Sequence, residues 1–238
     1  MTALVMVGAG GTASHLIHPL FQYALMPNPE STLHIYDEDK VEDKNLSRQL
    51  FWPTDIGKNK VDALAERFNT HQVVPHSEYI GLNDSAVPPR AAVQNGDTVF
   101  ICADNMFVRG LINEHAKTLD DVIIINGGNE EHTGSVQVFM RQKGKNITPS
   151  LDFNSPEFSN HEDPDISELS CAEIANLPGG EQTVIANFSV AALMLQALHR
   201  VWNSAYGNGD TQWTKQTFDF QTGTVQTSDV RLIGGLDA

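Results

Sequence analysis

The chain has 238 residues, of which 40% are hydrophobic and 19% are charged, a balance that gives a globular protein with a substantial core. This composition excludes a disordered chain, a collagen-like chain and a coiled coil. Thirty acidic residues against 15 basic ones give a formal net charge of −15, so neither nucleic acid nor an anionic membrane is expected as a partner. No apolar run approaches the roughly 18–20 residues needed to span a bilayer, and no basic leader precedes the first one, so a cytoplasmic protein is expected.

The first half of the sequence predicts strands that alternate with helices. Strands are expected at 4–7, 33–36, 73–80, 98–103 and 122–125, and helices at 13–24, 58–69, 91–93 and 107–119. Strands and helices of this length in alternation indicate βαβ units. We therefore expect an α/β, Rossmann-like fold with a mostly parallel sheet and helices on both faces.

The second half predicts an antiparallel C-terminal extension. A strand at 135–140 is followed by a long acidic segment rich in Pro, Asn and Ser, then by a strongly apolar helix at 182–201. Two alternating runs, 213–220 and 224–232, flank a Gln-Thr-Gly turn and predict a hairpin. We expect a single domain (1–238), with a nucleotide-binding half at 1–140, an acidic crossover loop at 141–173, and the C-terminal helix and hairpin at 174–238.

A glycine-rich turn lies between the first strand and the first helix, with Gly8, Gly10 and Gly11 in the pattern Gly-x-Gly-Gly-x-Ala. Glycine lets the backbone approach a ligand, and the N–H groups at a helix N-terminus attract an anion. Asp37 ends the next strand, where a carboxylate accepts hydrogen bonds from a ribose and repels a 2′-phosphate. The turn and Asp37 together predict a nucleotide site that disfavours NADP.

A polar cluster after Asp37 favours a triphosphate. The sequence Asn45-Leu-Ser-Arg48-Gln49 is followed by lysines, among them Lys60, and arginine and lysine neutralise charge that builds on phosphates. Asp104, which with Asn105 follows the fourth strand, offers the oxygen ligand that Mg²⁺ prefers.

These motifs resemble the ThiF/MoeB/HesA superfamily of adenylyltransferases, which includes the activating enzymes for ubiquitin-like proteins. The resemblance rests on the glycine loop, the acids after the second strand, "NLSRQLF", "DIGKNK", "ADNMFVRGLIN" and "INGGNEEHTGSVQVF". It implies ATP and Mg²⁺ as cofactors, a ubiquitin-like or sulfur-carrier protein as partner, and a homodimer. The short length and the acidic loop most resemble compact bacterial members, including those of the PRTRC systems.

By this resemblance, Arg48, Lys60 and Asp104 are the catalytic residues of adenylation, and Asp104 also supports the metal. Lys58 is the alternative to Lys60. The residues expected to bind the nucleotide are Gly8, Gly10, Gly11, Asp37, Asp39, Asn45, Arg48, Gln49, Lys60, Asp104 and Asn105.

The two cysteines have different expected roles. Cys171 follows the crossover loop, where the thioester-forming branches of the superfamily carry a nucleophile. Because its acidic surroundings oppose ionisation of the thiol, an inert loop cysteine is the alternative. Cys102 lies in an apolar strand and is expected in the core. With no Cys-x-x-Cys pair, no zinc is expected.

One departure from the family pattern leaves other functions open. The N-terminal arginine that some dimeric relatives contribute to the partner's site has no counterpart before the first strand. Either Arg109 or another group replaces it, or the dimer contributes to the site differently. The alternatives to an adenylyltransferase are a non-catalytic nucleotide-binding scaffold and an NAD-dependent oxidoreductase, which the glycine loop and Asp37 alone would favour.

Overall fold

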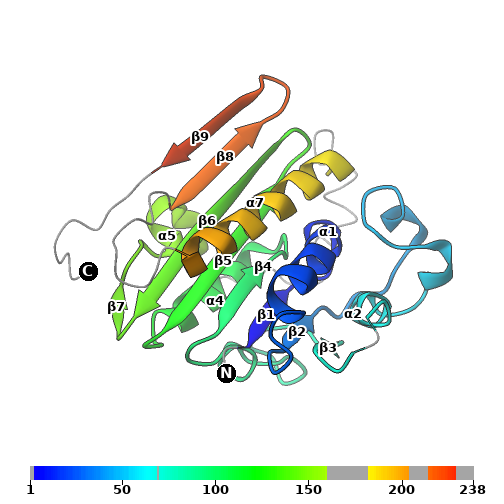
Figure 1. Ribbon diagram of the computed structural model, residues 1–238, viewed down its shortest axis with the longest axis horizontal. Coiled ribbons are helices and arrows are strands. Elements are labelled where there is room, and N and C mark those ends of the chain that lie inside the picture. Colours follow the sequence, from blue (N-terminus) through cyan, green and yellow to red (C-terminus); the bar gives the residue numbers. More distant parts are fainter. Residues whose placement is uncertain (1–2, 69, 160–181, 204–213, 229–238) are drawn as a thin grey trace.

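A nine-stranded mixed sheet forms the centre of the computed structural model, which describes residues 3–68, 70–159, 182–203 and 214–228 (Figure 1). The spatial order is β3-β2-β1-β4-β5-β6-β8-β9, and β7 pairs with β6. The strands are β1 (Leu4–Val7), β2 (Leu33–Tyr36), β3 (Val73–His76), β4 (Thr98–Ile101), β5 (Val122–Asn129), β6 (Thr133–Gln142), β7 (Lys145–Asn146), β8 (Lys215–Asp219) and β9 (Thr224–Ser228).

The first five strands form the parallel half that the sequence predicts. Leu4 of β1 lies opposite Leu33 of β2 on one side and Thr98 of β4 on the other. All four residues of β1 and all four of β4 are buried, as expected of strands covered on both faces. The order of strands reverses between β1 and β4, which makes the carboxyl ends of these two strands the position where open α/β sheets bind ligands.

The remaining strands are antiparallel, as expected for the C-terminal extension. β5 turns directly into β6, β6 pairs with β8, and β8 pairs with β9. The predicted hairpin is confirmed: β8 and β9 are joined by a turn in which Gly223 has φ +70°, a conformation that glycine adopts without steric cost. The outer parts of both predicted strands, including Trp213, lie outside the described residues.

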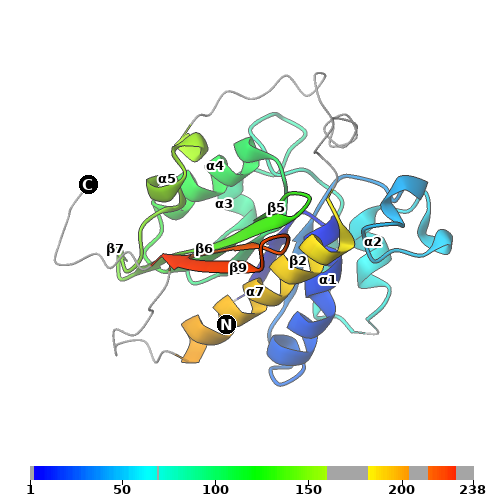
Figure 2. The same cartoon turned by 90° about the horizontal axis from the view of Figure 1, so that it is seen from above.

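The helices cover both faces of the sheet (Figure 2). α1 and α7 pack together on one face, where α7 crosses β5 and β6, and α3, α4 and α5 lie on the other face. Side chains therefore alternate between two cores, with Leu4 and Met6 in one and Val5 and Val7 in the other. The helices are α1 (Gly11–Leu20), α2 (Lys60–Ala65), α3 (Pro89–Ala92), α4 (Met106–Ala116), α5 (Leu151–Asn154) and α7 (Val184–Asn203).

Several predicted boundaries were wrong, for identifiable reasons. α1 passes into a π-helical turn at Phe21–Leu25, shortly after Pro19, which has no N–H to donate. α2 starts at Lys60 because the backbone N–H of Lys60 donates to the carbonyl of Asp39, outside the helix. The strand expected at 73–80 ends at His76, and the segment expected to be a loop after residue 140 contains α5 and a 3₁₀ turn at Pro156–Ser159.

Among the described residues, α7 is the one helix long and apolar enough by length and composition to cross a membrane. This qualifies the sequence-based expectation that no segment reaches that length. Its buried residues Val190, Ala191 and Met194 belong to the core on the α1 face of the sheet. α7 is therefore the core helix of a globular domain.

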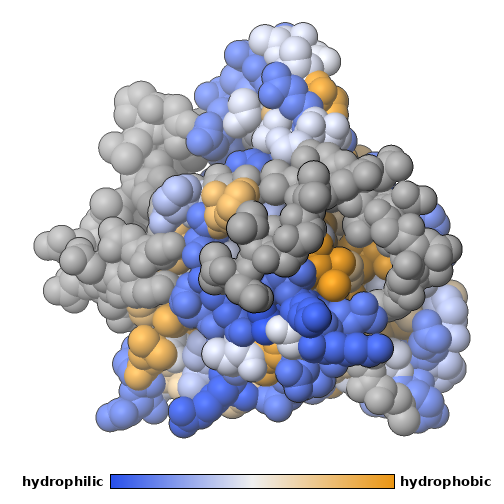
Figure 3. Space-filling model, turned by 90° about the vertical axis from the view of Figure 1, so that its left-hand side faces the viewer, coloured by the Kyte–Doolittle hydropathy of each residue, from blue (hydrophilic) through white to orange (hydrophobic). Residues whose placement is uncertain are grey.

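On the side of the molecule where β7 and β9 lie, hydrophilic residues predominate and hydrophobic surface occurs in separate small areas (Figure 3).

Candidate nucleotide-binding site

A large open cleft lies at the carboxyl ends of β1, β2, β4 and β5, where the parallel strands present their last residues to the same edge. Its volume is about 1210 Å³. β6 and the β8–β9 hairpin extend the cleft beyond the parallel strands. All the nucleotide-binding residues that the sequence predicts line this cleft, namely Gly8, Gly10, Gly11, Asp37, Asp39, Asn45, Arg48, Gln49, Lys60, Asp104 and Asn105.

The glycine loop brings the backbone to the floor of the cleft. Gly8 has φ +90°, and a Cβ there would lie 2.6 Å from the backbone nitrogen of Ala103, so only glycine fits. Gly10 is the N-cap residue of α1, and no side chain among the described residues caps this helix. Its first N–H groups therefore point toward the cleft, with the positive end of the helix dipole behind them.

Asp37 fixes the loop from the neighbouring strand. One carboxylate oxygen accepts a hydrogen bond of 2.6 Å from the backbone N–H of Ala9, and the other accepts one of 2.9 Å from the N–H of Asp39. Burial raises the pKa of Asp37, while Lys60 and these two N–H groups act in the opposite direction. The carboxylate is thus placed at the end of β2, one strand away from the helix N-terminus.

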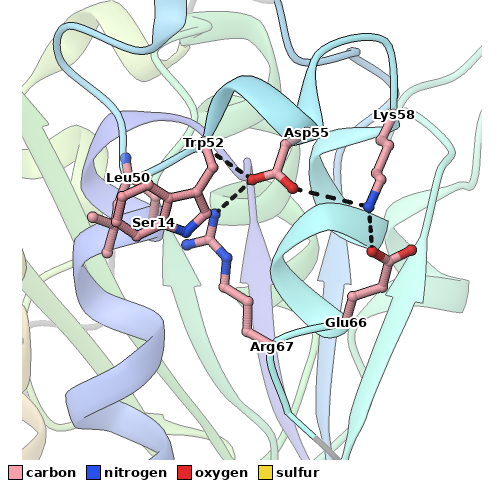
Figure 4. Close-up of polar contacts among 7 residues, drawn as sticks. All are labelled: Ser14, Leu50, Trp52, Asp55, Lys58, Glu66 and Arg67. Atoms are coloured by element: carbon pink, nitrogen blue, oxygen red, sulfur yellow. Dashed lines mark hydrogen bonds and ion pairs between the residues drawn. The ribbon is translucent and has the colours of Figure 1, made fainter.

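Lys60 and Lys58 point to different places. Lys60 is 7% exposed, lines the cleft, and its Nζ lies 2.7 Å from the carboxylate of Asp39. Lys58 instead pairs with Glu66 at 2.5 Å and approaches Asp55, which also accepts a hydrogen bond from Arg67 (Figure 4). Lys58 does not line the cleft. The geometry therefore favours Lys60 over Lys58 as the lysine that meets a ligand.

The Asn45–Gln49 segment lines the cleft beside α1. Asn45 is buried, and its side-chain oxygen accepts a hydrogen bond of 2.8 Å from the N–H of Glu42, closing a 3₁₀ turn at Asp43–Asn45. Arg48 is half-buried and Gln49 is buried. Within the described residues, Oε1 of Gln49 has no hydrogen-bond partner, which leaves a buried acceptor beside Gly10.

The segment after β4 contributes one exposed carboxylate and one helix cap. Asp104 is exposed in the cleft. Asn105 is the N-cap of α4, and its side-chain oxygen accepts hydrogen bonds from the N–H groups of Phe107 and Val108 at 2.9 and 3.3 Å. Asn105 therefore orders the start of α4, and through it the position of Asp104.

Arg109 is held by the ends of β4 and β5 instead of reaching outward. It is 6% exposed and donates at 2.8 Å to the carbonyl oxygens of Ala103 and Gly127 and to the side chain of Asn126. Burial lowers the pKa of Arg109, and Asp104 raises it. From the sequence, Arg109 was only one candidate to replace the N-terminal arginine of dimeric relatives.

Sequence reasoning missed a buried polar chain beside Arg109. Asn126 donates to Gln137, its partner across the β5–β6 pair, and Gln137 donates at 3.0 Å to Ser155. All three residues line the cleft and are buried. The polar residues at 126 and 137 interrupt otherwise apolar strands, which was the one available signal.

The two cysteines differ in what the structure describes. Cys171 lies outside the described residues, so its role stays a prediction. Cys102 packs against the hydrophobic core just after β4, and burial raises the pKa of its thiol to about 12. Its thiol therefore stays protonated at neutral pH. The residue is half-buried and also lines the cleft, so the core position expected from the sequence is only partly met.

Comparison with known proteins places these features in a family. The model of the ThiF family matches residues 2–232. Over 124 residues the chain is 35% identical to the adenylyltransferase and sulfurtransferase uba4 of Aspergillus niger, covering 51% of this chain and 24% of that protein. Over 171 residues it is 31% identical to the Nedd8-activating enzyme E1 catalytic subunit of Drosophila melanogaster, covering 65% of this chain and 36% of that protein. The chain thus spans about a quarter to a third of the length of these relatives.

Solved structures show the same fold. The crystal structure of E. coli MccB with MccA-N7isoASN superimposes with a TM-score of 0.71 and 18% identity, covering 97% of this chain and 64% of that one. E. coli MccB with ATP gives a TM-score of 0.69 and 17% identity, with the same coverage. At this identity the likeness establishes the fold.

Proposed function

The chain belongs to the ThiF family, and from this premise we propose that it is an ATP-dependent adenylyltransferase. Its proposed substrate is the C-terminal carboxylate of a small ubiquitin-like or sulfur-carrier protein, or of a peptide. The observation that carries the proposal is the convergence of Asp37, Arg48 and Lys60 on one cleft beside the uncapped N-terminus of α1. Similarity to proteins named as adenylyltransferase and Nedd8-activating enzyme supports it.

In the orientation that we propose for ATP, the ribose and the triphosphate meet different groups of the cleft. The ribose hydroxyls meet Asp37 at the end of β2, and the triphosphate lies over Gly10 and Gly11, where the N–H groups of α1 face it. Arg48 and Lys60, which also line the cleft, contact the phosphates. Their positive charges are opposite in sign to the net charge of the protein and attract the phosphates.

In this orientation the residues act by positioning and charge neutralisation. An oxygen of the substrate carboxylate attacks the α-phosphorus, forming a new P–O bond, while the bond between the α-phosphorus and the bridging oxygen breaks and pyrophosphate leaves with that electron pair. Arg48 and Lys60 stabilise the charge that develops on the phosphoryl oxygens. No nucleophile of the protein takes part in this step.

Asp104 fits the family's magnesium requirement. Within the described ranges there is no group of three or more His, Cys, Asp or Glu side chains that could form a metal cage. Mg²⁺ bound with a nucleotide commonly uses one or two carboxylates together with phosphate oxygens, and Asp104 supplies an exposed carboxylate in the cleft. When bound, the ion supplies further neutralisation of the phosphate charge.

Two finer elements of the proposal follow the family. Cys171 then takes the acyl group from the adenylate: its thiolate attacks the acyl carbon, the thioester C–S bond forms and AMP leaves. The functional unit is a homodimer. Arg109 does not replace a partner's arginine in this scheme, because three of its donors are already held by the ends of β4 and β5.

The test is ATP–pyrophosphate exchange with a ubiquitin-like sulfur carrier that ends in Gly-Gly, supported by mass spectrometry of the acyl-adenylate. We expect exchange with the wild-type protein, its loss in Asp104→Ala, and its retention in Cys171→Ala. Exchange that survives in Asp104→Ala refutes the assignment of that carboxylate. Thioester that persists in Cys171→Ala refutes the assignment of the thiol.

A further inference from the structure

We propose that Asn187 of α7 is a positioning residue that sets the place of Arg48 in the nucleotide cleft. The proposal rests on the function proposed above, in which Arg48 contacts the triphosphate. Asn187 lies 139 residues after Arg48 in the sequence, and its side chain does not itself line the cleft. It acts through the backbone on which Arg48 is carried.

Asn187 is fully buried at the junction of three segments. Its Nδ2 donates a hydrogen bond of 3.1 Å to the carbonyl oxygen of Arg48, and its Oδ1 accepts one of 3.4 Å from the hydroxyl of Thr12 in the first turn of α1. The amide also occupies the space above Gly11, where a Cβ would overlap it. One side chain thus contacts both segments that line the proposed triphosphate site, the first turn of α1 and the backbone of Arg48.

The backbone around Arg48 is held from both sides. The N–H of Gln49 donates at 2.8 Å to the carbonyl of Asn45, and the N–H of Leu50 donates at 3.0 Å to the hydroxyl of Ser14 in α1 (Figure 4). These bonds fix the residues that follow Arg48. Asn187 supplies the bond to the carbonyl of Arg48 itself.

The start of α7 is anchored independently of the cleft. The hydroxyl of Thr183 donates at 3.1 Å to the carbonyl of Glu131 in the β5–β6 turn and accepts a hydrogen bond of 3.1 Å from the N–H of Ala186. Asn187 therefore projects from a helix end whose position the sheet determines. Because this end of α7 is anchored, the buried amide of Asn187 can fix the position of the loop that carries Arg48.

A polar side chain at a fully buried position is costly unless its hydrogen bonds are made. A hydrophobic residue would fill the same space, so the amide is explained by its partners. Removing it leaves the Arg48 carbonyl with one fewer partner and opens space above Gly11. The Arg48 backbone can then relax toward that space, and a displacement of about 1 Å is enough to weaken a charge-assisted contact strongly.

The experiment is a double-mutant cycle with Asn187→Ala and Arg48→Ala, measuring the dissociation constant of MgATP by calorimetry and kcat/KM in pyrophosphate exchange. Asn203→Ala is the matched control, because Asn203 lies at the exposed end of the same helix and bonds to Tyr23 and His199. Melting temperatures of all variants monitor folding. A residue that acts through Arg48 must lose its effect when Arg48 is absent.

We expect Asn187→Ala to weaken MgATP binding about tenfold in the wild-type background and less than twofold in the Arg48→Ala background. Asn203→Ala should bind MgATP as the wild type does. Equal losses in both backgrounds show that Asn187 acts on the fold as a whole and overturn the inference alone. Wild-type protein that binds no MgATP refutes the proposed function, and the positioning role with it.

Discussion

Replacement of Lys60 by methionine isolates the charge that the account places on the phosphates. Methionine keeps most of the length and apolar volume of the side chain and removes the ammonium group. Lys60 is 9% exposed at the side chain, whereas its partner Asp39 is 57% exposed. After the substitution Asp39 remains solvated, so the free energy of unfolding should change by about 1 kcal/mol or less.

The effect on the ligand should be larger. A hydrogen bond to a charged group contributes about 1.5–3 kcal/mol, so the dissociation constant of MgATP should rise roughly 10- to 150-fold. Lys60 also opposes the rise in the pKa of Asp37 that burial causes. Removal of the Lys60 ammonium raises the pKa of Asp37 further. As the pH falls and Asp37 takes up a proton, the variant should therefore lose MgATP binding at a higher pH than the wild type does.

Calorimetric titration of MgATP into wild type, Lys60→Met and Lys58→Met measures this. Lys58 is the matched control, two residues away, with its ammonium on Glu66 and Asp55 outside the cleft. Lys58→Met should bind MgATP within twofold of the wild type. Wild-type affinity in Lys60→Met, or an equal loss in both variants, would refute the assignment of Lys60.

Two further predictions concern stability. Gly8→Ala should lower the free energy of unfolding in urea by more than about 2 kcal/mol, because Gly8 has a positive φ and its new Cβ would lie 2.6 Å from a backbone atom. Gly223→Ala should lower it by about 1 kcal/mol, because Gly223 has φ +70° but no atom lies within 4 Å of its new Cβ. Equal losses in the two variants would contradict the packing argument. Burial lowers the pKa values of His34 and His76, whose rings share a hydrogen bond of 2.9 Å. As the pH falls from 7.5 to 5.5, these histidines take up protons more readily in the unfolded chain than in the folded protein, so the free energy of unfolding should fall. His76→Gln should make this pH dependence less steep. An unchanged slope in that variant would contradict the role given to these histidines.

The sequence predicts the parallel half of the fold because its signals are local. The buried runs at β1 and β4, the glycines between β1 and α1, and Asp37 after β2 each reflect a short-range requirement. The end of α1 was less accurate because Pro19 precedes a π-helical turn, and the start of α2 because a tertiary hydrogen bond determines it. The N–H of Lys60, for example, bonds to Asp39 instead of extending the helix.

The rest of the site depends on contacts between distant segments, which no local pattern reveals. In the sequence, Asn187 is only a polar residue in an apolar helix. Its role follows from the hydrogen bond to the carbonyl of Arg48 in the structure. Arg109 was considered only as a replacement for the N-terminal arginine, because the three acceptors that hold it come from the ends of two strands. The choice between Lys58 and Lys60 likewise needed the direction of each side chain.

The central claim is that this cleft binds ATP for adenylyl transfer. The most direct measurement is calorimetric titration of the wild-type protein with MgATP and, separately, with NAD⁺, with Asp37→Ala as the control for the ribose contact. The account predicts saturable binding of MgATP that Asp37→Ala loses, and no comparable binding of NAD⁺. Binding of NAD⁺ alone would contradict it in favour of an oxidoreductase, and MgATP binding unchanged in Asp37→Ala would place the nucleotide outside this cleft.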